Sequence, residues 1–423
     1  MNVLILGSGG REHAIAYKIT QSSLLNKLFI APGNAGTASL GQNIPISITD
    51  FQEVKQAMIK HQIDLIIVGP ELPLVAGIYD FFASDSELED IKIIGPDKQG
   101  AQLEGSKAFA KEFMLRYQIP TAAYKSFTEA SLSQAFNFLE DLQPPYVLKA
   151  DGLAAGKGVL ILDDLNEAKQ ELQEILGNNK FGNAGQTVVI EEFLKGIEMS
   201  CFALTDGKDY VILPNAKDYK RIGEGDTGLN TGGMGAVSPV PFADSALLEK
   251  IEEKIIKPTI LGLQKEAIDY QGFLFFGLMI VDKEPFVIEY NVRMGDPETE
   301  VVFPRIESDV LGLFQACVSG NLKNYRMQVT SQSATTVMAV SKGYPKTYEK
   351  GKEITGLKLV TDSMVFHSGT KKEGDIVLSN GGRVLAVTSF GNSFKDALKL
   401  SYKSLKKIHF QGITYRNDIG FDL

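Results

Sequence analysis

The first hundred residues alternate short apolar runs with segments of helical periodicity, and this alternation restricts the fold more than any other feature. The apolar runs cover residues 3–6, 28–30, 63–68 and 91–94. Strands that alternate with helices predict a parallel, doubly wound sheet. Each run ends in a loop that carries glycine or proline, and ligands bind at such carboxyl-end loops. We therefore expect residues 1–104 to form a doubly wound domain that binds a substrate.

Further units must follow, because 423 residues exceed what one hydrophobic core usually serves. A helix over 106–117 opens the second unit, which also contains a long glycine-rich loop over 218–235. A hairpin with arms 273–281 and 286–293 closes this unit, and a strand-rich tail follows. The predicted fold is multidomain, α/β and α+β, with units at 1–104, 105–322 and 323–423.

Charge and cysteine content exclude several classes of function. The formal charge of −9 repels a polyphosphate backbone, so we expect no nucleic-acid partner. Cys201 and Cys317 lack the spacing of a zinc site or a disulfide framework, which favours a reducing, cytoplasmic location. No apolar run approaches the roughly 20 residues that span a bilayer, and no basic leader precedes the first strand, so we expect no membrane contact. Nothing demands more than a monomer.

The glycine loop after the first strand is not a dinucleotide fingerprint. Its sequence is GSGGRE, and Glu12 occupies the position of the third glycine, where close packing of helix on strand requires a small residue. An NAD-dependent oxidoreductase is therefore disfavoured. The amides of Gly9 and Gly10 and the guanidinium of Arg11 can still bind phosphate at a helix N-terminus. A plain tight turn is the alternative.

A second glycine loop, KADGLAAGKG over residues 149–158, indicates ATP. It lies between two predicted strands, so it is a hairpin-like flap rather than the strand-loop-helix of a Walker site. Gly158 also replaces the Ser or Thr that would contact magnesium. Glycine amides can close over phosphates, and Lys149 and Lys157 can neutralise them. A flexible surface hairpin explains the two lysines poorly.

A predicted strand near residue 290 carries a candidate metal site. Glu289 and Asn291 are two apart, share one face, and offer the oxygen ligands that Mg²⁺ accepts beside nucleotide phosphates. Arg293 is predicted to continue this face. The next turn can place Asp296 and Glu298 near a substrate amine, and a capped turn is the competing explanation.

Taken together, these segments resemble the phosphoribosylamine–glycine ligases, also called glycinamide ribonucleotide synthetases, of the ATP-grasp superfamily. The matching segments run in order through the chain: GSGGREHA, APGNAGT, VGPELPLVAG, LEGSKAF, LKADGLAAGKGV, VIEEFLKGIE, DTGLNTGGMGA, IEYNVRMGDPETE, FHSGTK and NGGRVLAVT. The resemblance implies an ATP-grasp body with a mobile lid over about 121–190. It also implies ATP-dependent ligation of glycine to 5-phosphoribosylamine in purine biosynthesis, through glycyl phosphate and with Mg²⁺ or Mn²⁺.

The resemblance implies roles for individual residues. Lys149 and Arg293 would be catalytic, and Glu289 and Asn291 would hold the metal. ATP would contact Lys107, Lys149, Gly156, Lys157, Gly158, Glu191, Glu192, Phe193, Leu194 and Glu198. The substrates would contact Gly9, Gly10, Arg11, Asn34, Glu71, Asn230, Thr231, Gly232, Gly233, Arg293 and Asp296.

Three positions depart from the family pattern. Tyr219 stands where a histidine is expected, Leu229 where a proline is usual, and Val237 where a tyrosine is usual. All three touch the substrate loop, so they bear on affinity or loop order rather than on the class of reaction. Two further alternatives remain open. One is an ATP-grasp ligase for another carboxylate or amine, such as a carboxylase-like enzyme, and the other is a non-catalytic nucleotide sensor built on the same fold.

Overall fold

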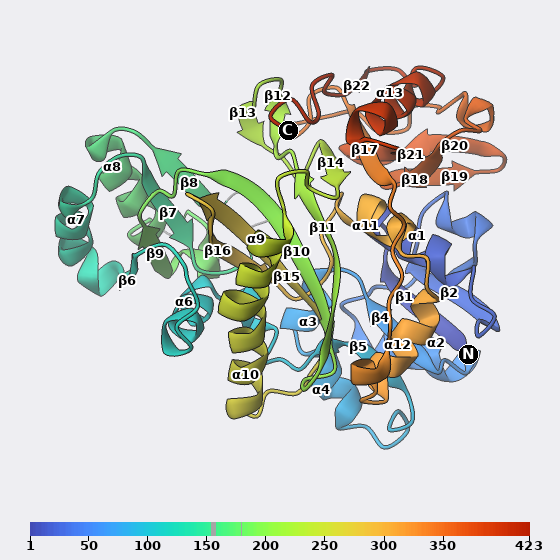
Figure 1. The fold of residues 1–423 in the computed structure, drawn as a ribbon, viewed down its shortest axis with the longest axis horizontal. Helices are drawn as coiled ribbons and strands as arrows, with labels where there is room; N and C mark the ends of the chain where they lie inside the picture. Colours follow the sequence, from blue (N-terminus) through green and yellow to red (C-terminus); the bar gives the residue numbers. More distant parts are fainter. Residues whose placement is uncertain (154–157, 179) are drawn as a thin grey trace.

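The computed structural model describes residues 1–153, 158–178 and 180–423, and one mixed sheet runs through all three predicted units. Among these residues the sheet has 14 strands, in the order β18-β21-β17-β14-β11-β10-β15-β5-β4-β1-β2-β3, with β16 beside β15 and β22 beside β17. Figure 1 shows the N-terminal part in blue, the central strands in green and yellow, and the C-terminal part in orange and red above the N-terminal part.

The N-terminal end of this sheet is parallel, which confirms the predicted doubly wound arrangement. Apart from the short polar edge strand β3, its strands are largely buried apolar runs, as expected where helices cover both faces of a sheet. The strands are β1 (Asn2–Gly7), β2 (Lys27–Pro32), β3 (Gln42–Asn43), β4 (Leu65–Val68) and β5 (Lys92–Pro96). The helices of this part are α1 (Gly10–Ile19), α2 (Phe51–His61), α3 (Glu71–Val75), α4 (Ile78–Ala83) and α5 (Gln102–Gly105).

The central strands are antiparallel and join the parallel part through β15 and β5. They are β10 (Ile197–Thr205), β11 (Tyr210–Asp218), β14 (Gly235–Ser238), β15 (Tyr270–Val281) and β16 (Glu284–Asn291). Helices α6 (Lys107–Arg116), α9 (Ser245–Ile251), α10 (Lys257–Lys265), α11 (Thr299–Arg305) and α12 (Val310–Val318) belong to this part, with a π-helical turn, η4 (Glu252–Ile256), between α9 and α10.

Three sequence expectations for the central part need correction. The β15–β16 hairpin turns at Asp282-Lys283, which take positive φ angles of 49° and 65°, so the turn has two residues rather than four. Strand β16 ends at Asn291, and Arg293 therefore does not continue the face of Glu289. The predicted glycine-rich loop contains a short hairpin, β12 (Arg221–Gly223) and β13 (Thr227–Asn230), whose chain reverses at Gly225 and Asp226.

The C-terminal strands extend the same sheet from β14, which pairs antiparallel with β17. They are β17 (Ser333–Ser341), β18 (Met364–His367), β21 (Arg383–Gly391) and β22 (Ile413–Thr414), with a separate hairpin of β19 (Thr370–Glu373) and β20 (Ile376–Ser379). Helix α13 (Phe394–Leu405) buries Ala397, Leu398 and Leu405. This tail is strand-rich, as predicted.

A second, four-stranded sheet stands apart from the main body at the left of Figure 1. It contains β6 (Tyr124–Thr128), β7 (Tyr146–Ala150), β8 (Val159–Leu162) and β9 (Thr187–Glu191), with helices α7 (Leu132–Asp141) and α8 (Leu165–Leu176). Its buried residues form a hydrophobic cluster separate from those of the main sheet. Within the described ranges, no helix is both long enough and apolar enough to cross a bilayer.

Candidate active site

A cavity of about 1080 Å³ opens between the four-stranded sheet and the main sheet, a volume suited to a nucleotide and small substrates. Its wall contains most of the predicted site residues. These are Arg11, Glu71, Lys107, Lys149, Gly158, Glu191, Glu192, Phe193, Leu194, Glu198, Asn230, Thr231, Gly232, Glu289, Asn291, Arg293 and Asp296. Gly156 and Lys157, predicted for ATP phosphates, lie outside the described residues.

At one end of the cavity, two buried lysines share one carboxylate. Glu191, the last residue of β9, has one oxygen 3.0 Å from Lys149 Nζ and the other 3.1 Å from Lys111 Nζ. Burial lowers the pKa of Lys111 to about 8, against the opposing effect of Glu191. Two ammonium groups against one carboxylate leave a positive charge, which suits phosphates. Lys111 was not predicted, because its spacing within α6 looks like that of any helical lysine.

The residues that follow β7, up to Leu153, are contacted by Lys107 and Ser106. Strands β7 and β8 pair antiparallel, which confirms the predicted hairpin-like arrangement. Lys107 Nζ donates to the Gly152 carbonyl at 3.0 Å, and the Ser106 hydroxyl donates to the Asp151 carboxylate. Burial lowers the pKa of Lys107 as well, although Glu289 opposes this.

The segment predicted for adenine lies along the same wall. Glu192 does not offer its side chain freely, because it accepts from the Ala123 amide at 2.8 Å, and its own amide donates to the Ala123 carbonyl. Phe193 is 39% exposed at the wall. Glu198, predicted for ribose hydroxyls, pairs with Lys220 at 2.8 Å, and the charge of Lys220 lowers the pKa of Glu198.

The candidate metal residues lie on β16, at an irregular point of the β15–β16 pairing. The register shifts between Gly277 and Leu278, opposite Glu289, and a Cβ at Gly277 would come within 3.0 Å of Glu289 Cγ. Asn291 is 7% exposed, and its amide nitrogen has no hydrogen-bond partner among the described residues. In the part of the chain that the structure describes, no group of three or more His, Cys, Asp or Glu side chains is arranged to hold a metal.

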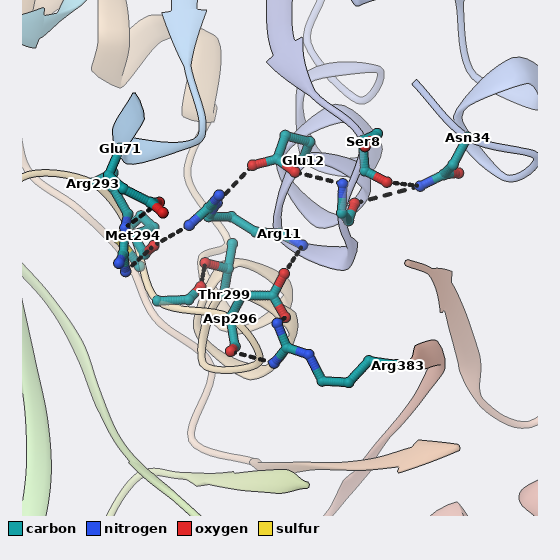
Figure 2. A network of polar contacts seen from close by, with 12 residues as sticks. Ser8, Arg11, Glu12, Asn34, Glu71, Arg293, Met294, Asp296, Thr299 and Arg383 are labelled. Carbon is teal, nitrogen blue, oxygen red and sulfur yellow. Dashed lines mark hydrogen bonds and ion pairs between the residues drawn. The ribbon is translucent and has the colours of Figure 1, made fainter. Parts of the chain in front are cut away.

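The other end of the cavity contains arginines that are paired with carboxylates (Figure 2). Arg293 Nη2 donates to Glu104 Oε1 at 2.5 Å. Arg293 Nε lies 3.5 Å from Glu71 Oε2, a contact drawn in Figure 2. Arg11 Nε donates to Glu12 Oε1 at 2.6 Å, and Arg11 Nη1 donates to the Met294 carbonyl at 3.1 Å. Arg293 thus reaches the cavity from the loop after β16. The carboxylates of Glu71 and Glu104, both in the N-terminal part, hold its guanidinium.

Glu12 explains why the first glycine loop lacks the third glycine of a dinucleotide site. The Glu12 carboxylate accepts from the Gly9 amide at 2.6 Å and fills the space beside the loop. A Cβ at Gly7, where φ is 128°, would lie 2.5 Å from Glu12, so glycine is required there. The loop is therefore closed by a carboxylate at the start of α1.

Three predicted substrate residues of the N-terminal part do not line the cavity as described. These are Gly9, Gly10 and Asn34. Asn34 uses both ends of its side chain internally: its oxygen accepts from the amides of Gly36 and Thr37, and its nitrogen donates to carbonyls of Ser8 and His367. Figure 2 shows this contact with Ser8. Asn34 therefore joins the N-terminal loop to the C-terminal strand β18.

Arg383, which the sequence did not single out, completes this end of the cavity. Arg383 Nη1 donates to the carbonyls of Gly232 and Asp296 at 2.5 and 2.6 Å, and Nη2 lies 3.0 Å from Asp296 Oδ1. The residue opens β21, within the segment NGGRVLAVT. An arginine between two glycines and an apolar strand was the available signal. Gly233, which was predicted to contact substrate, has a φ of 116°, and a Cβ at this position would collide with Pro297.

Buried acids also face this region. Glu298 is 3% exposed and accepts from the Ser200 hydroxyl at 3.1 Å. Burial, with the nearby charge of Asp218, raises the pKa of Glu298 to about 7. Lys220 lies 3.9 Å from Asp218; although burial opposes it, the charges of Asp218, Glu198 and Glu289 raise the pKa of Lys220 well above its usual value. Glu298 thus provides a proton acceptor, and Lys220 a cation, in the same part of the cavity.

The second sheet, its flap and the cation-rich cavity beneath it define an ATP-grasp protein. Family models for the three domains of phosphoribosylglycinamide synthetase match this chain: the N domain over residues 1–104, the ATP-grasp (A) domain over 105–299 and the C domain over 334–422. The chain therefore belongs to the phosphoribosylglycinamide synthetase family.

Individual relatives agree with this assignment. The chain is 46% identical over 420 residues to the phosphoribosylamine–glycine ligase of Caldanaerobacter subterraneus, which covers 99% of both chains. It is 45% identical over 427 residues to that of Chlorobaculum tepidum, again covering 99% of both. The crystal structure of the Thermotoga maritima ligase superposes with a TM-score of 0.86 at 37% identity, covering 99% of this chain and 100% of that one. The predicted family and fold class are confirmed.

More distant structures share the fold alone. The biotin carboxylase domain of the Hydrogenobacter thermophilus 2-oxoglutarate carboxylase, solved with MgADP, superposes with a TM-score of 0.72 at 15% identity, over 98% of this chain and 91% of that one. ATP-grasp enzymes use ATP with Mg²⁺. Family membership removes the oxidoreductase and the carboxylase-like enzyme from the alternatives.

Proposed function

We propose that this chain joins glycine to 5-phosphoribosylamine through glycyl phosphate, and that the charged cavity residues stabilise both steps. The activity follows from the family: the chain is an ATP-dependent ligase of purine biosynthesis, a phosphoribosylamine–glycine ligase by its full-length relatives. The observation that best supports the mechanism is one cavity lined by Lys107, Lys111, Lys149 and Arg293. Cations placed where charge develops accelerate acyl and phosphoryl transfer.

The chemistry needs two displacements and no protein nucleophile. A carboxylate oxygen of glycine attacks the γ-phosphorus of ATP, and the bond to the β-phosphate oxygen breaks to give glycyl phosphate and ADP. The amine of phosphoribosylamine then attacks the acyl carbon, inorganic phosphate leaves, and the nitrogen loses a proton. The products are glycinamide ribonucleotide, ADP and phosphate.

We assign the residues to these steps by their positions. Lys149 and Lys107 would face the ATP phosphates, and the segment Glu191–Leu194 with Glu198 would face adenine and ribose. Arg293 would stabilise the transferred phosphoryl group, because Glu104 and Glu71 hold its guanidinium in place. Arg11, Glu71, Asp296 and the loop Asn230–Gly232 would face the two substrates. Glu298, with its pKa raised to about 7, would accept the proton of the amine.

Glu289 and Asn291 fit a bound Mg²⁺ or Mn²⁺. Both line the cavity, and the Asn291 amide is buried with its nitrogen unpartnered in the described structure, so this end of the side chain is free to turn its oxygen toward a cation. A divalent cation there would neutralise the phosphates and polarise the transferred group. Two protein ligands leave further positions to phosphate oxygens and water, as is usual for Mg²⁺.

The domain division at 1–104, 105–322 and 323–423, with a lid over about 121–190, is part of the same proposal. The separate hydrophobic cluster of the lid supports its movement as a unit. We further propose that the chain acts as a monomer in the cytoplasm, on glycine and phosphoribosylamine.

The decisive experiment measures ADP formation from ATP and Mg²⁺. Glycine is supplied with and without phosphoribosylamine, which is generated in the assay from ribose 5-phosphate and ammonia. We expect sustained turnover only when both substrates are present, and ¹⁸O transfer from the glycine carboxylate to phosphate. Turnover without ¹⁸O transfer would exclude the glycyl phosphate intermediate.

A further inference from the structure

A segment near residue 423 contributes to the wall of the cavity. Asp422 lines the cavity together with Lys217, Asp218 and Lys220, although it is 203 residues away from Tyr219. Figure 1 places this end of the chain beside the β12–β13 hairpin. The segment 416–423 therefore touches the loop that carries the predicted substrate residues.

Asp422 binds two residues: Lys217, which lies in β11, and Tyr219, which directly follows that strand. The Tyr219 hydroxyl donates to Asp422 Oδ1 at 2.8 Å, and Lys217 Nζ lies 3.2 Å from Asp422 Oδ2. The Tyr219 ring is 1% exposed, with Lys217 Nζ at 4.7 Å and the Arg416 guanidinium at 5.4 Å from its centroid. A carboxylate that engages a partner at each oxygen fixes both partners.

Arg416 fastens the adjoining hairpin to the same segment. Its side chain is 1% exposed and donates to Asp226 Oδ1 at 2.6 Å and to the Arg221 carbonyl at 3.1 Å. Arg416 also pairs with Asp418, which accepts from the Gly225 amide at 2.7 Å. The whole β12–β13 hairpin is thus tied to residues 416–418.

The position of Tyr219 fixes that of Asp218 and Lys220, because the three residues are consecutive and Tyr219 is anchored from the side opposite the cavity. Tyr219 packs into the hydrophobic cluster of the C-terminal part, whereas Asp218 and Lys220 face the cavity. Lys220 contacts Glu198, and both residues line the same cavity as Glu289, the candidate metal residue. The wall that Tyr219 anchors therefore lies beside the place where the glycine carboxylate must meet the γ-phosphate.

We propose that Asp422, Tyr219 and Lys217 form a latch that positions Asp218 and Lys220 for glycine binding. The inference rests on the proposed function. Tyr219 and Asp422 are positioning residues, since their polar groups bind each other and the latch acts on glycine through Asp218 and Lys220. The tyrosine at this departure from the family pattern thus has a specific partner, its hydroxyl bond to Asp422.

The test is a double-mutant cycle of Tyr219→Phe and Asp422→Asn, with Tyr402→Phe as the matched control. Tyr402 also donates a hydroxyl bond to this segment, at 2.9 Å to the Arg416 carbonyl, but it is not part of the cavity wall as described. The KM values for glycine and for ATP, kcat, and the midpoint of thermal unfolding are measured for each variant.

We expect each single latch variant to raise the KM for glycine about tenfold, the effect of losing one hydrogen bond to a charged group. The KM for ATP should stay unchanged, and the double variant should equal the stronger single one, because both changes weaken the same Tyr219–Asp422 contact. Additive effects, a parallel rise in the KM for ATP, or the same rise in Tyr402→Phe would overturn the latch. Wild-type turnover without glycine would instead refute the proposed function.

Discussion

The two ends of the cavity are built differently. The nucleotide end takes Lys107, Lys111, Lys149 and Glu191 from one continuous part of the chain; Lys111 and Lys149 share the Glu191 carboxylate, and Lys107 donates to the Gly152 carbonyl. The acceptor end takes Arg11, Arg293 and Arg383 from the N-terminal, central and C-terminal parts, and each guanidinium lies against a carboxylate.

This difference separates two functions of charge. A surplus of ammonium groups attracts phosphates and needs a bound nucleotide to balance it. Arginine–carboxylate pairs already balance each other, so they act by holding groups in fixed positions before a substrate arrives. The acceptor end is therefore a preorganised frame, whereas the nucleotide end carries a positive charge that no carboxylate balances.

The largest effect is expected where the two ends meet, at Glu289. Replacing Glu289 by alanine should lower kcat by about a thousandfold or more, because it would remove the metal ligand that we propose for both steps. ADP release at saturating substrates measures this effect, and circular dichroism checks the fold. The matched control is Glu284→Ala on the same strand, where Glu284 pairs only with Lys250 and Lys254 and should leave turnover unchanged. Equal activity of the two variants would remove Glu289 from the metal site.

A smaller effect is expected from breaking the frame of the acceptor end. Arg383→Ala should lower kcat/KM for phosphoribosylamine by about a hundredfold, since Asp296 and the Gly232 loop lose their shared partner. The KM for ATP should hardly change. Arg383→Lys keeps the charge without the planar fork, so it should recover only part of the loss. If both substrates and ATP were affected alike, the two ends would not be independent.

At the nucleotide end we expect a pH effect of about tenfold. Above the Lys111 pKa of about 8, the ammonium loses its charge and ATP loses one cation, so the KM for ATP should rise between pH 7 and pH 9. Lys111→Met should show a raised but flatter profile. A wild-type KM for ATP that stays constant over this range would contradict the assignment.

The lowered pKa of Lys111 also affects stability, and here a rise in pH is favourable. The folded-state pKa of Lys111 lies below its usual value of 10.5, so the unfolded chain binds more protons between about pH 8 and pH 10.5. The contribution of Lys111 to the free energy of unfolding therefore increases with pH across this window. Comparing denaturant unfolding of the wild type and Lys111→Met at pH 7 and pH 10 isolates this contribution.

The smallest catalytic effect is expected at Asn34. Asn34→Ala should destabilise the fold by about 1–3 kcal/mol, because it leaves buried partners of its amide unpaired. Its KM for phosphoribosylamine should stay within about twofold of the wild-type value, since both ends of the side chain are already engaged by backbone amides and carbonyls. A large rise in this KM without loss of stability would restore the role that the family resemblance implies for Asn34.

Much of the nucleotide end could be predicted because its signals are local. Lys149 and Glu191 each sit at the end of a recognisable strand, and the glycine flap between β7 and β8 follows from its composition. Glu289 and Asn291 share a face because a strand alternates its side chains. The prediction that Arg293 continues the face of Glu289 was wrong, because the strand ends two residues earlier. Periodicity alone does not show where a strand stops.

The acceptor end was less predictable. Gly9 and Gly10 belong to the loop GSGGRE and Asn34 to the loop APGNAG, yet the Gly9 amide donates to Glu12 and the Asn34 side chain donates to the His367 carbonyl of β18. Arg383 lies in the recognisable segment NGGRVLAVT, but nothing local shows which group it binds, and Asp422 carries no local pattern. Their partners, Asp296 and Tyr219, lie 87 and 203 residues away.

The sequence by itself determined the strands and helices, the order of the glycine loops, and with them the family and the class of reaction. Each of these depends on the spacing of residues within a short stretch. Only the tertiary structure decided that β15 pairs with β5 and β14 with β17, which merges three units into one sheet. That pairing brings Arg383 to Asp296 and Asp422 to Tyr219, because contacts between distant residues depend on strand order and register rather than on local periodicity.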